Sequence, residues 1–137
     1  MARHTYLCPL RWSDVDVLGH VNNVVFLRLV EEARVDLLYG QGVLERKPDE
    51  GFLVVRHEID YKAQLRYRKE PLPIDVWVER AGNASFAITS ELYDDRDQTR
   101  LLYARATTVL APVNMTTGFP HRVSPELREQ LARWTDA

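Results

Sequence analysis

Apolar residues recur every four positions between residues 21 and 39, which predicts one long helix. The positions that set this period are Val21, Val25, Leu29, Ala33 and Leu37. Residues four apart lie on one face of a helix. Phe26, Val30 and Leu38 widen the apolar surface beyond one stripe. We therefore expect this helix to be covered on several sides rather than to lie on a surface.

Both ends of this segment carry residues that suit helix boundaries. Asn22 and Asn23 precede the periodic region, and Asn is a favourable N-cap because its side chain accepts a backbone hydrogen bond. Gly40 and Gly42 follow it, and glycine adopts the left-handed conformation that often ends a helix. Near the C-terminus, the triplet at 124–126, Ser-Pro-Glu, predicts the start of a short second helix.

Apolar and polar residues alternate in several other segments, and this period of two predicts β-strands. The most regular run is 55–66, where six residues with apolar or aromatic side chains, His57 included, alternate with charged and polar residues. Gly82-Asn83 and the polar run 94–97 predict turns between the later strands. The predicted strands are 4–11, 55–66, 72–79, 86–92 and 101–111.

The order of elements is therefore strand, helix, and then four strands with short connections. Short connections favour antiparallel neighbours. One apolar helix and one antiparallel sheet form an α+β arrangement, and we expect the sheet to curl around the helix. The length of 137 residues fits a single domain spanning 1–137.

Composition narrows the class of protein. The chain is 45% hydrophobic and 28% charged, as in globular proteins. The net charge of −2 argues against a general nucleic-acid binder. No apolar run reaches the roughly 20 residues needed to span a membrane, and residues 1–6 lack the apolar stretch of a secretory signal. We expect a cytoplasmic protein whose single cysteine, Cys8, forms no internal disulfide and no zinc site.

The segment 11–23 concentrates the candidate chemistry. Asp14 and Asp16 lie in a polar, glycine-containing turn directly before the predicted helix. A helix N-terminus presents unpaired N–H groups and a partial positive charge, which can polarise a carbonyl oxygen. A carboxylate beside it can attack that carbonyl or deprotonate a water molecule. This pattern predicts a hydrolytic site that needs no metal, no cofactor and no serine nucleophile.

The run 14–23, DVDVLGHVNN, resembles the signature of hotdog-fold acyl-CoA thioesterases, together with Phe26 and the run EEAR at 31–34. The nearest branch contains 4-hydroxybenzoyl-CoA thioesterase and small bacterial long-chain acyl-CoA thioesterases. The resemblance implies a curled antiparallel sheet around one central helix, and homodimers or homotetramers with sites at the dimer interface. It assigns Asp16 as the catalytic carboxylate and the Asn23 N–H as the group that polarises the thioester carbonyl.

The resemblance also guides the expected substrate and its contacts. The run 20–23 replaces a more aromatic segment of the 4-hydroxybenzoyl-CoA enzyme, which favours a fatty acyl group over an aromatic one. Within the signature we expect Gly19, His20 and Asn22 to contact the substrate. Coenzyme A carries phosphates, which arginine binds well. Arg66 and Arg68 are the first candidates for this contact, and Arg56, Lys62 and Arg122 are further ones.

Two alternatives concern the catalytic residue. Other hotdog branches place the catalytic carboxylate on the central helix, so Glu31 and Glu32 are rivals of Asp16. Glu32 is also four residues from Arg28, a spacing at which the two side chains can simply form an ion pair. For Asp14, a role in shaping or capping the turn competes with a role in chemistry.

Two alternatives concern the function. A hotdog dehydratase acting on acyl-carrier protein would use a histidine with an acid on the helix, but the segment 21–39 contains no histidine. A non-hydrolytic module that binds acyl-CoA or acyl-carrier protein would use the same fold. The sequence leaves open whether Asp16 acts as nucleophile or as general base.

Overall fold

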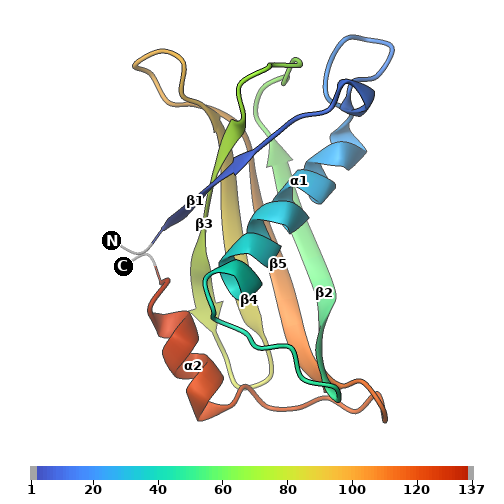
Figure 1. The fold of residues 1–137 in the computed structure, drawn as a ribbon, viewed down its shortest axis with the longest axis vertical. Helices are drawn as coiled ribbons and strands as arrows, with labels where there is room; N and C mark the ends of the chain where they lie inside the picture. The colour runs from blue at the N-terminus through green and yellow to red at the C-terminus, as the bar shows by residue number, and fades with distance from the viewer. Residues whose placement is uncertain (1–2, 136–137) are drawn as a thin grey trace.

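The computed structural model describes residues 3–135; residues 1, 2, 136 and 137 of the predicted domain lie outside this range. One sheet, one long helix and one short helix make up most of the fold (Figure 1). The elements are β1 (His4–Cys8), η1 (Trp12–Asp14), α1 (Asn23–Val35), η2 (Asp36–Gly40), β2 (Glu50–Tyr61), β3 (Leu72–Ala81), β4 (Phe86–Asp94), β5 (Leu101–Asn114) and α2 (Pro125–Ala132).

The five strands form a single sheet in the order β1-β3-β4-β5-β2, and every neighbouring pair is antiparallel. Helix α1 lies across one face of this curled sheet, with α2 near the end of β3 (Figure 1). The core forms where the inward side chains of the strands meet α1, among them Leu29, Ile74, Ile88 and Leu92. The predicted α+β architecture with a curled antiparallel sheet and one long helix is confirmed.

Both predicted helix boundaries have the expected chemistry. The Asn22 side chain accepts a hydrogen bond from the N–H of Val24, so Asn22 is the N-cap of α1. Ser124 caps α2 in the same way by accepting from Leu127, with Pro125 at the first helical position. The long helix continues beyond Val35 as the π-helical turn η2, which still includes Gly40. Of the two glycines predicted at the helix end, Gly42 adopts a φ of 75° and Gly40 does not have a positive φ. The predicted range 21–39 thus spans two helical forms.

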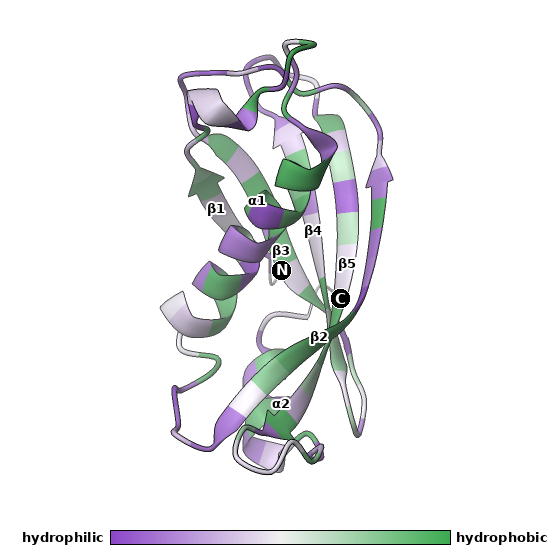
Figure 2. Cartoon of the chain, turned by 90° about the vertical axis from the view of Figure 1, so that its right-hand side faces the viewer, coloured by the Kyte–Doolittle hydropathy of each residue, from purple (hydrophilic) through white to green (hydrophobic). Residues whose placement is uncertain are grey.

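The burial of α1 differs from the prediction. Only one side of α1 is buried, and it presents Phe26, Leu29, Val30 and Ala33 to the sheet. On the opposite side Val24 remains 68% exposed in the single chain. The expectation that the helix is covered on several sides is therefore wrong for one protomer. Figure 2 shows this mixture as alternating hydrophilic and hydrophobic segments along α1.

The strand predicted at 55–66 is observed as β2, five residues earlier at its start and at its end. β2 is an edge strand whose register against β5 shifts between Val54 and Arg56, as in a β-bulge. After Tyr61, the N–H groups of Lys62 and Ala63 both donate to the carbonyl of Tyr103, which ends the ladder. Most of β2 is exposed, so its polar and apolar alternation does not become an alternation of burial.

Charged side chains cover the outer face of the sheet. Asp75, Glu91, Arg100 and Arg105 are joined there by ion pairs. The Trp77 ring is only 2% exposed, because the guanidinium of Arg3 stacks 3.8 Å from its centroid. Trp77, a large aromatic of the kind enriched at subunit contacts, is therefore already covered within its own chain.

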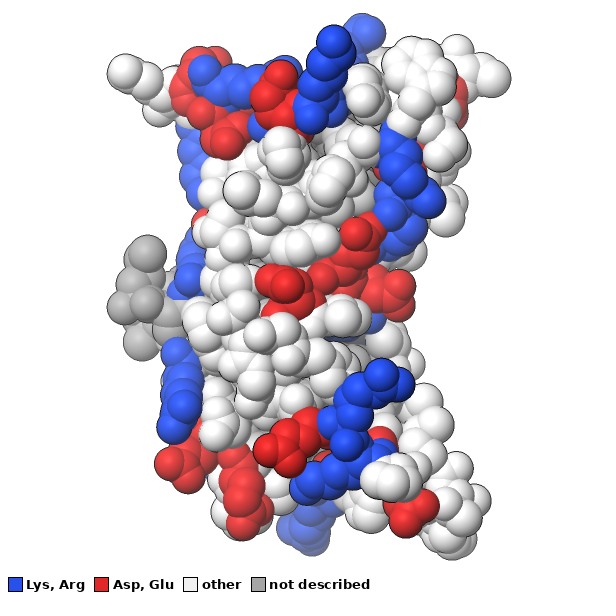
Figure 3. Space-filling view, viewed as in Figure 1, with Lys and Arg blue, Asp and Glu red and all other residues white. Residues whose placement is uncertain are grey.

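On the face that carries α1, acidic and basic side chains are interspersed, so neither sign of charge dominates this face (Figure 3). Among the described residues, no helix has both the length and the apolar character required to cross a membrane. Cys8, at the end of β1, is fully buried in the core.

Candidate active site at the start of the long helix

A tight loop brings the two aspartates of the signature to the start of α1. The N–H of Asp16 donates to the carbonyl of His20, and the N–H of Gly19 donates to the carbonyl of Asp16. Gly19 adopts a φ of 81°, a conformation that glycine tolerates and side chains with a Cβ rarely adopt. The loop is anchored to the segment after β2, because the N–H of Val21 donates to the carbonyl of Leu65 at 2.7 Å.

The loop leaves one carboxylate oxygen of Asp16 available. Oδ1 accepts a hydrogen bond from the N–H of Leu18 at 2.9 Å, which orients the carboxylate. Oδ2 has no hydrogen-bond partner within residues 3–135. The N–H of Asn23, the first residue of α1, is likewise unpaired within that range. A free carboxylate oxygen and a free helix N-terminal N–H thus lie on one short segment.

These two groups share the wall of one cavity. Its volume is about 350 Å³, within the range of small-molecule sites. The lining residues are Asp16, His20, Val21, Asn23, Phe26, Tyr61, Lys62, Ala63, Gln64 and Leu65. Apolar and aromatic walls on one side and a carboxylate with a backbone donor on the other suit an apolar ligand with one reactive carbonyl.

His20 adds a polar group to the cavity. Its Nε2 atom is buried and has no hydrogen-bond partner in the described part of the chain. A buried polar atom without a partner is costly, so a group of the ligand or a water molecule is needed to satisfy it. Across the cavity, the hydroxyl of Tyr61 donates to the carbonyl of Asn23 at 2.9 Å, which joins the end of β2 to the start of α1.

Asp14 has a different environment from Asp16. It is 1% exposed, and its carboxylate accepts from the backbone N–H of Arg11 at 2.8 Å and from the guanidinium of Arg28 at 2.8 Å. Arg28 also pairs with Glu32, as the four-residue spacing predicted. Asp14 therefore fixes the loop to the first turns of α1, which agrees with the turn-shaping alternative for this residue.

The rival acids of the helix lie away from the Asp16 cavity. Glu31 and Glu32 line a separate depression of about 280 Å³ with Tyr6, Val35 and Asp36. Glu32 is engaged by Arg28, whereas Glu31 is largely exposed. The geometry therefore brings neither acid together with the free N–H of Asn23.

The basic residues separate into two groups. Arg66 is exposed and pairs with His20 in an isolated β-bridge; a Cβ added at Gly19 would lie 4.0 Å from its Nη1 atom. Lys62 is exposed at the cavity rim. Arg68, in contrast, is 4% exposed and donates to the carbonyls of Glu70 and Pro71 and to Asp95.

The structure thus places Arg66 and Lys62 beside the cavity and uses Arg68 to hold the loops around it. Arg56 pairs with Glu58 on the exposed edge strand. Arg122 lies in the segment before α2, and α2 lies at the other end of the molecule from the start of α1 (Figure 1). Asn22, predicted to contact substrate, has its side chain engaged as the helix cap.

Comparison with known proteins agrees with this geometry. A profile of the thioesterase-like superfamily matches residues 10–131, which includes the loop, the helix and all strands but β1. The chain belongs to the thioesterase-like superfamily. It is a thioester hydrolase with the hotdog fold. No curated protein matches its sequence.

Solved structures share the fold of this thioesterase over nearly its whole length. A protein from Pseudomonas aeruginosa is 28% identical, with 98% of this chain and 92% of that chain covered and a TM-score of 0.83. A predicted thioesterase from Bacillus stearothermophilus is 25% identical, with 98% of each chain covered and a TM-score of 0.82. A 1,4-dihydroxy-2-naphthoyl-CoA thioesterase from Synechocystis is 19% identical, covers 95% and 96% of the two chains, and has a TM-score of 0.81.

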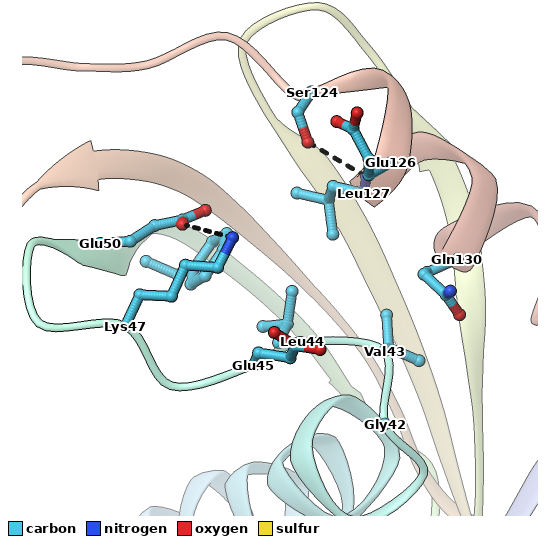
Figure 4. Close-up of a pocket in the computed structure, with 11 residues that line it drawn as sticks. Gly42, Val43, Leu44, Glu45, Lys47, Glu50, Ser124, Glu126, Leu127 and Gln130 are labelled. Atoms are coloured by element: carbon cyan, nitrogen blue, oxygen red, sulfur yellow. Dashed lines mark hydrogen bonds and ion pairs between the residues drawn. The ribbon is translucent and has the colours of Figure 1, made fainter.

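A second cavity of the thioesterase lies at the opposite end of the molecule, where the loop after η2, the start of β2 and α2 meet (Figure 4). It measures about 260 Å³. Glu45, Glu126 and the Lys47–Glu50 ion pair stand at its polar wall. None of the residues predicted to act on substrate lines it.

Sequence reasoning missed one wall of the Asp16 cavity. Tyr61, Ala63, Gln64 and Leu65 come from the end of β2 and the segment that follows it. They reach the site because Val21 and His20 pair with that segment, a contact between residues more than forty positions apart. The periodic pattern in 55–66 indicated a strand there but gave no signal for this pairing.

Proposed function

We propose that this thioesterase hydrolyses acyl-CoA, with a fatty acyl group, to the free acid and coenzyme A. The proposal depends on one observation: the free oxygen of Asp16 and the unpaired N–H of Asn23 belong to residues that line the same cavity. The thioester carbonyl oxygen accepts from that N–H, at the positive end of α1. Phe26 and the other apolar wall residues cover the start of the acyl chain.

Two chemical routes use this arrangement. As general base, Asp16 takes a proton from water, the hydroxide adds to the carbonyl carbon, and the C–S bond breaks with release of the thiolate, which is then protonated. As nucleophile, a carboxylate oxygen of Asp16 adds to the same carbon and expels the thiolate, giving a mixed anhydride that water hydrolyses. Single-turnover hydrolysis in ¹⁸O-water identifies the anhydride route when water attacks the Asp16 carbonyl carbon, since only that attack places ¹⁸O in Asp16.

Two further groups at the cavity suit substrate binding. The buried Nε2 atom of His20 is available to the thioester or to the attacking water, and Gly19 lets the loop approach closely. Arg66 and Lys62, exposed beside the opening, are suited to the phosphates of coenzyme A. Arg68 enters this proposal only as a support of the surrounding loops.

The proposed enzyme is a homodimer, or a homotetramer of two such dimers. β2 presents a free edge of 12 residues, and exposed edge strands pair readily with another strand. Leu53, Val54 and Val55 on this edge are all exposed. Since Tyr61 of β2 contacts the start of α1, pairing along β2 would bring a second chain close to the site.

The experiment is release of free thiol from a panel of saturated, aromatic and naphthoyl CoA thioesters, read with a thiol-reactive dye. Turnover with medium or long fatty acyl-CoA that falls by about 10²–10⁴-fold in Asp16→Asn and is kept in Asp60→Asn supports the proposal. Asp60 is a matched control because it is exposed on β2 and forms no ion pair within the described chain. Tight acyl-CoA binding with no thiol release would instead identify a binding module.

A further inference from the structure

Arg34, on the buried side of α1, has a guanidinium group without a strong partner. Its side chain is 7% exposed, and within residues 3–135 its only ion pair is with Glu31 at 3.7 Å, whose own side chain is largely in solvent. The Nη1 atom is buried with no hydrogen-bond partner in the described residues. A buried charge left this way is unfavourable unless an anion joins it.

A second polar group lies opposite Arg34 on β2. The Nδ1 atom of His57 is 2.9 Å from the hydroxyl of Thr108, and Thr108 is fully buried on β5. Nε2 of His57 is left free within residues 3–135. The pKa of His57 is lowered by partial desolvation of its ring and by the positive charge of Arg34.

The positions of these residues place them in line with the active site. Phe26, Val30 and Arg34 are successive i+4 positions on α1, and His57 and Tyr61 are four residues apart on β2. The two rows start together, since the rings of Phe26 and Tyr61 are 5.3 Å apart. The helix and strand run in opposite directions (Figure 1).

From that common start, both rows advance by the same length. Eight residues of helix cover about 12 Å, and four residues of strand about 13 Å. Arg34 and His57 are therefore level with each other, roughly 12 Å from the catalytic end. Between the two ends the facing positions on helix and strand are apolar, with Val30 buried and Ile59 half-buried.

We propose that Arg34 and His57 form a subsite for a carboxylate at the far end of the acyl chain, so that the preferred substrates are CoA thioesters of linear dicarboxylic acids. The inference rests on the proposed function, because the thioester must sit at Asp16. The apolar stretch between the two ends would hold the methylene chain. The planar guanidinium would bind the distal carboxylate through Nη1.

The test compares kcat/KM for a length series of dicarboxylic mono-CoA thioesters with that for monocarboxylic acyl-CoAs of equal carbon number. We expect one chain length at which the dicarboxylic substrate is favoured by on the order of tenfold to a hundredfold, as one hydrogen bond to a buried charge provides. Arg34→Met should bring this ratio close to one. Arg80→Met, at an exposed arginine on β3, should leave it unchanged.

Several outcomes would overturn the subsite. A wild-type ratio near one at every length would do so, as would an unchanged ratio in Arg34→Met. If Arg34→Met lowers turnover of both series equally and also dissociates an oligomer, the missing partner of Arg34 belongs to a second copy of the chain. If Arg34→Met does not fold, His57→Leu provides the same comparison, since His57 is exposed.

The failure of the proposed function is recognised separately. If no acyl-CoA of either series releases thiol, the thioesterase assignment to these substrates fails, whatever the state of Arg34. Calorimetry with the free dicarboxylic and monocarboxylic acids then still tests the subsite. Binding of the diacid that is stronger than that of the monoacid, and lost in Arg34→Met, supports it; equal binding of the two acids contradicts it.

Discussion

Two aspartates separated by one residue have opposite surroundings in this loop. Asp14 is buried between Arg11 and Arg28, with its oxygens occupied, whereas Asp16 keeps one oxygen free beside the start of α1. The same residue type therefore serves as a fixed support at one position and as an available base or nucleophile at the other. Their separation follows from the loop, which turns back at Gly19.

Asp16→Asn keeps the size of the side chain and its hydrogen bond from Leu18 while removing the charge. We expect kcat to fall by about 10²–10⁴-fold with little change in KM, since that is the usual value of general-base work. Thiol release under saturating substrate measures it. Asp14→Asn should retain more turnover but unfold at lower denaturant concentration. Near-normal turnover in Asp16→Asn with none in Glu32→Gln would move the catalytic acid to the helix.

Arg66→Ala tests the contact with coenzyme A. We expect KM to rise more than kcat falls, because the exposed guanidinium would act on binding and not on the reacting bond. In the wild type KM should also rise with salt, since exposed charges are screened beyond about 8–10 Å near physiological ionic strength. Arg80→Ala is the control. If KM changes neither with salt nor in Arg66→Ala, the phosphates are bound elsewhere.

Among the elements, β4 carries the most heavily paired acid of the sheet. Glu91 is buried on the outer face and accepts from Arg3 and Arg100 at 3.0 Å each and from Arg105 at 2.6 Å. Burial alone would raise the pKa of Glu91, but the hydrogen bonds from Arg100 and Arg105 and the charge of Arg3 outweigh it, so its pKa is lowered.

A lowered pKa makes the stability contribution of Glu91 depend on pH. The contribution is complete above the unfolded pKa of about 4.3 and is lost as pH falls through the lower folded value. Glu91→Gln should therefore reduce the free energy of unfolding at pH 7 and flatten its decline below about pH 4. Denaturant unfolding across pH measures both. Glu129→Gln on α2 is the control, and a decline as steep as that of the wild type in Glu91→Gln would contradict the assignment.

The elements also show which signals in the sequence were sufficient. Helix α2 was predicted correctly because Ser124 and Pro125 act within one turn of the chain. Strand β5 was predicted because Ala104, Ala106 and Thr108, which are buried in this central strand, alternate with less buried positions. The ends of β2 were missed, since an edge strand exposes both its polar and its apolar positions.

The residues of the candidate site divide in the same way. The loop and the start of α1 lie within ten residues, so the pattern of 14–23 located them together. The burial of Arg68 could not be predicted from the sequence. It depends on a carbonyl from the loop before β3 and a carboxylate from the loop after β4. The pairing of Val21 with Leu65 is another long-range contact that no local pattern encodes.

For the whole molecule, we expect a dimer at least at micromolar concentration, joined along the free edge of β2. Sedimentation velocity or light scattering measures the mass directly. Leu53→Lys places a charge on this edge and should produce a monomer, because edge lysines oppose strand pairing. Lys47→Leu, in the loop before β2, is a control that keeps the edge intact. A wild-type monomer would remove β2 as an interface.

The thiol of Cys8 is unreactive in the folded protein. It is fully buried at the end of β1, and burial raises its pKa to about 12, so the reactive thiolate is scarce at neutral pH. In the folded protein, Ellman-type reagents should therefore react with released coenzyme A and leave Cys8 intact, whereas one equivalent should react per chain in guanidinium chloride. High enzyme concentrations can then be used on slow substrates without background, and air oxidation should not cross-link two chains.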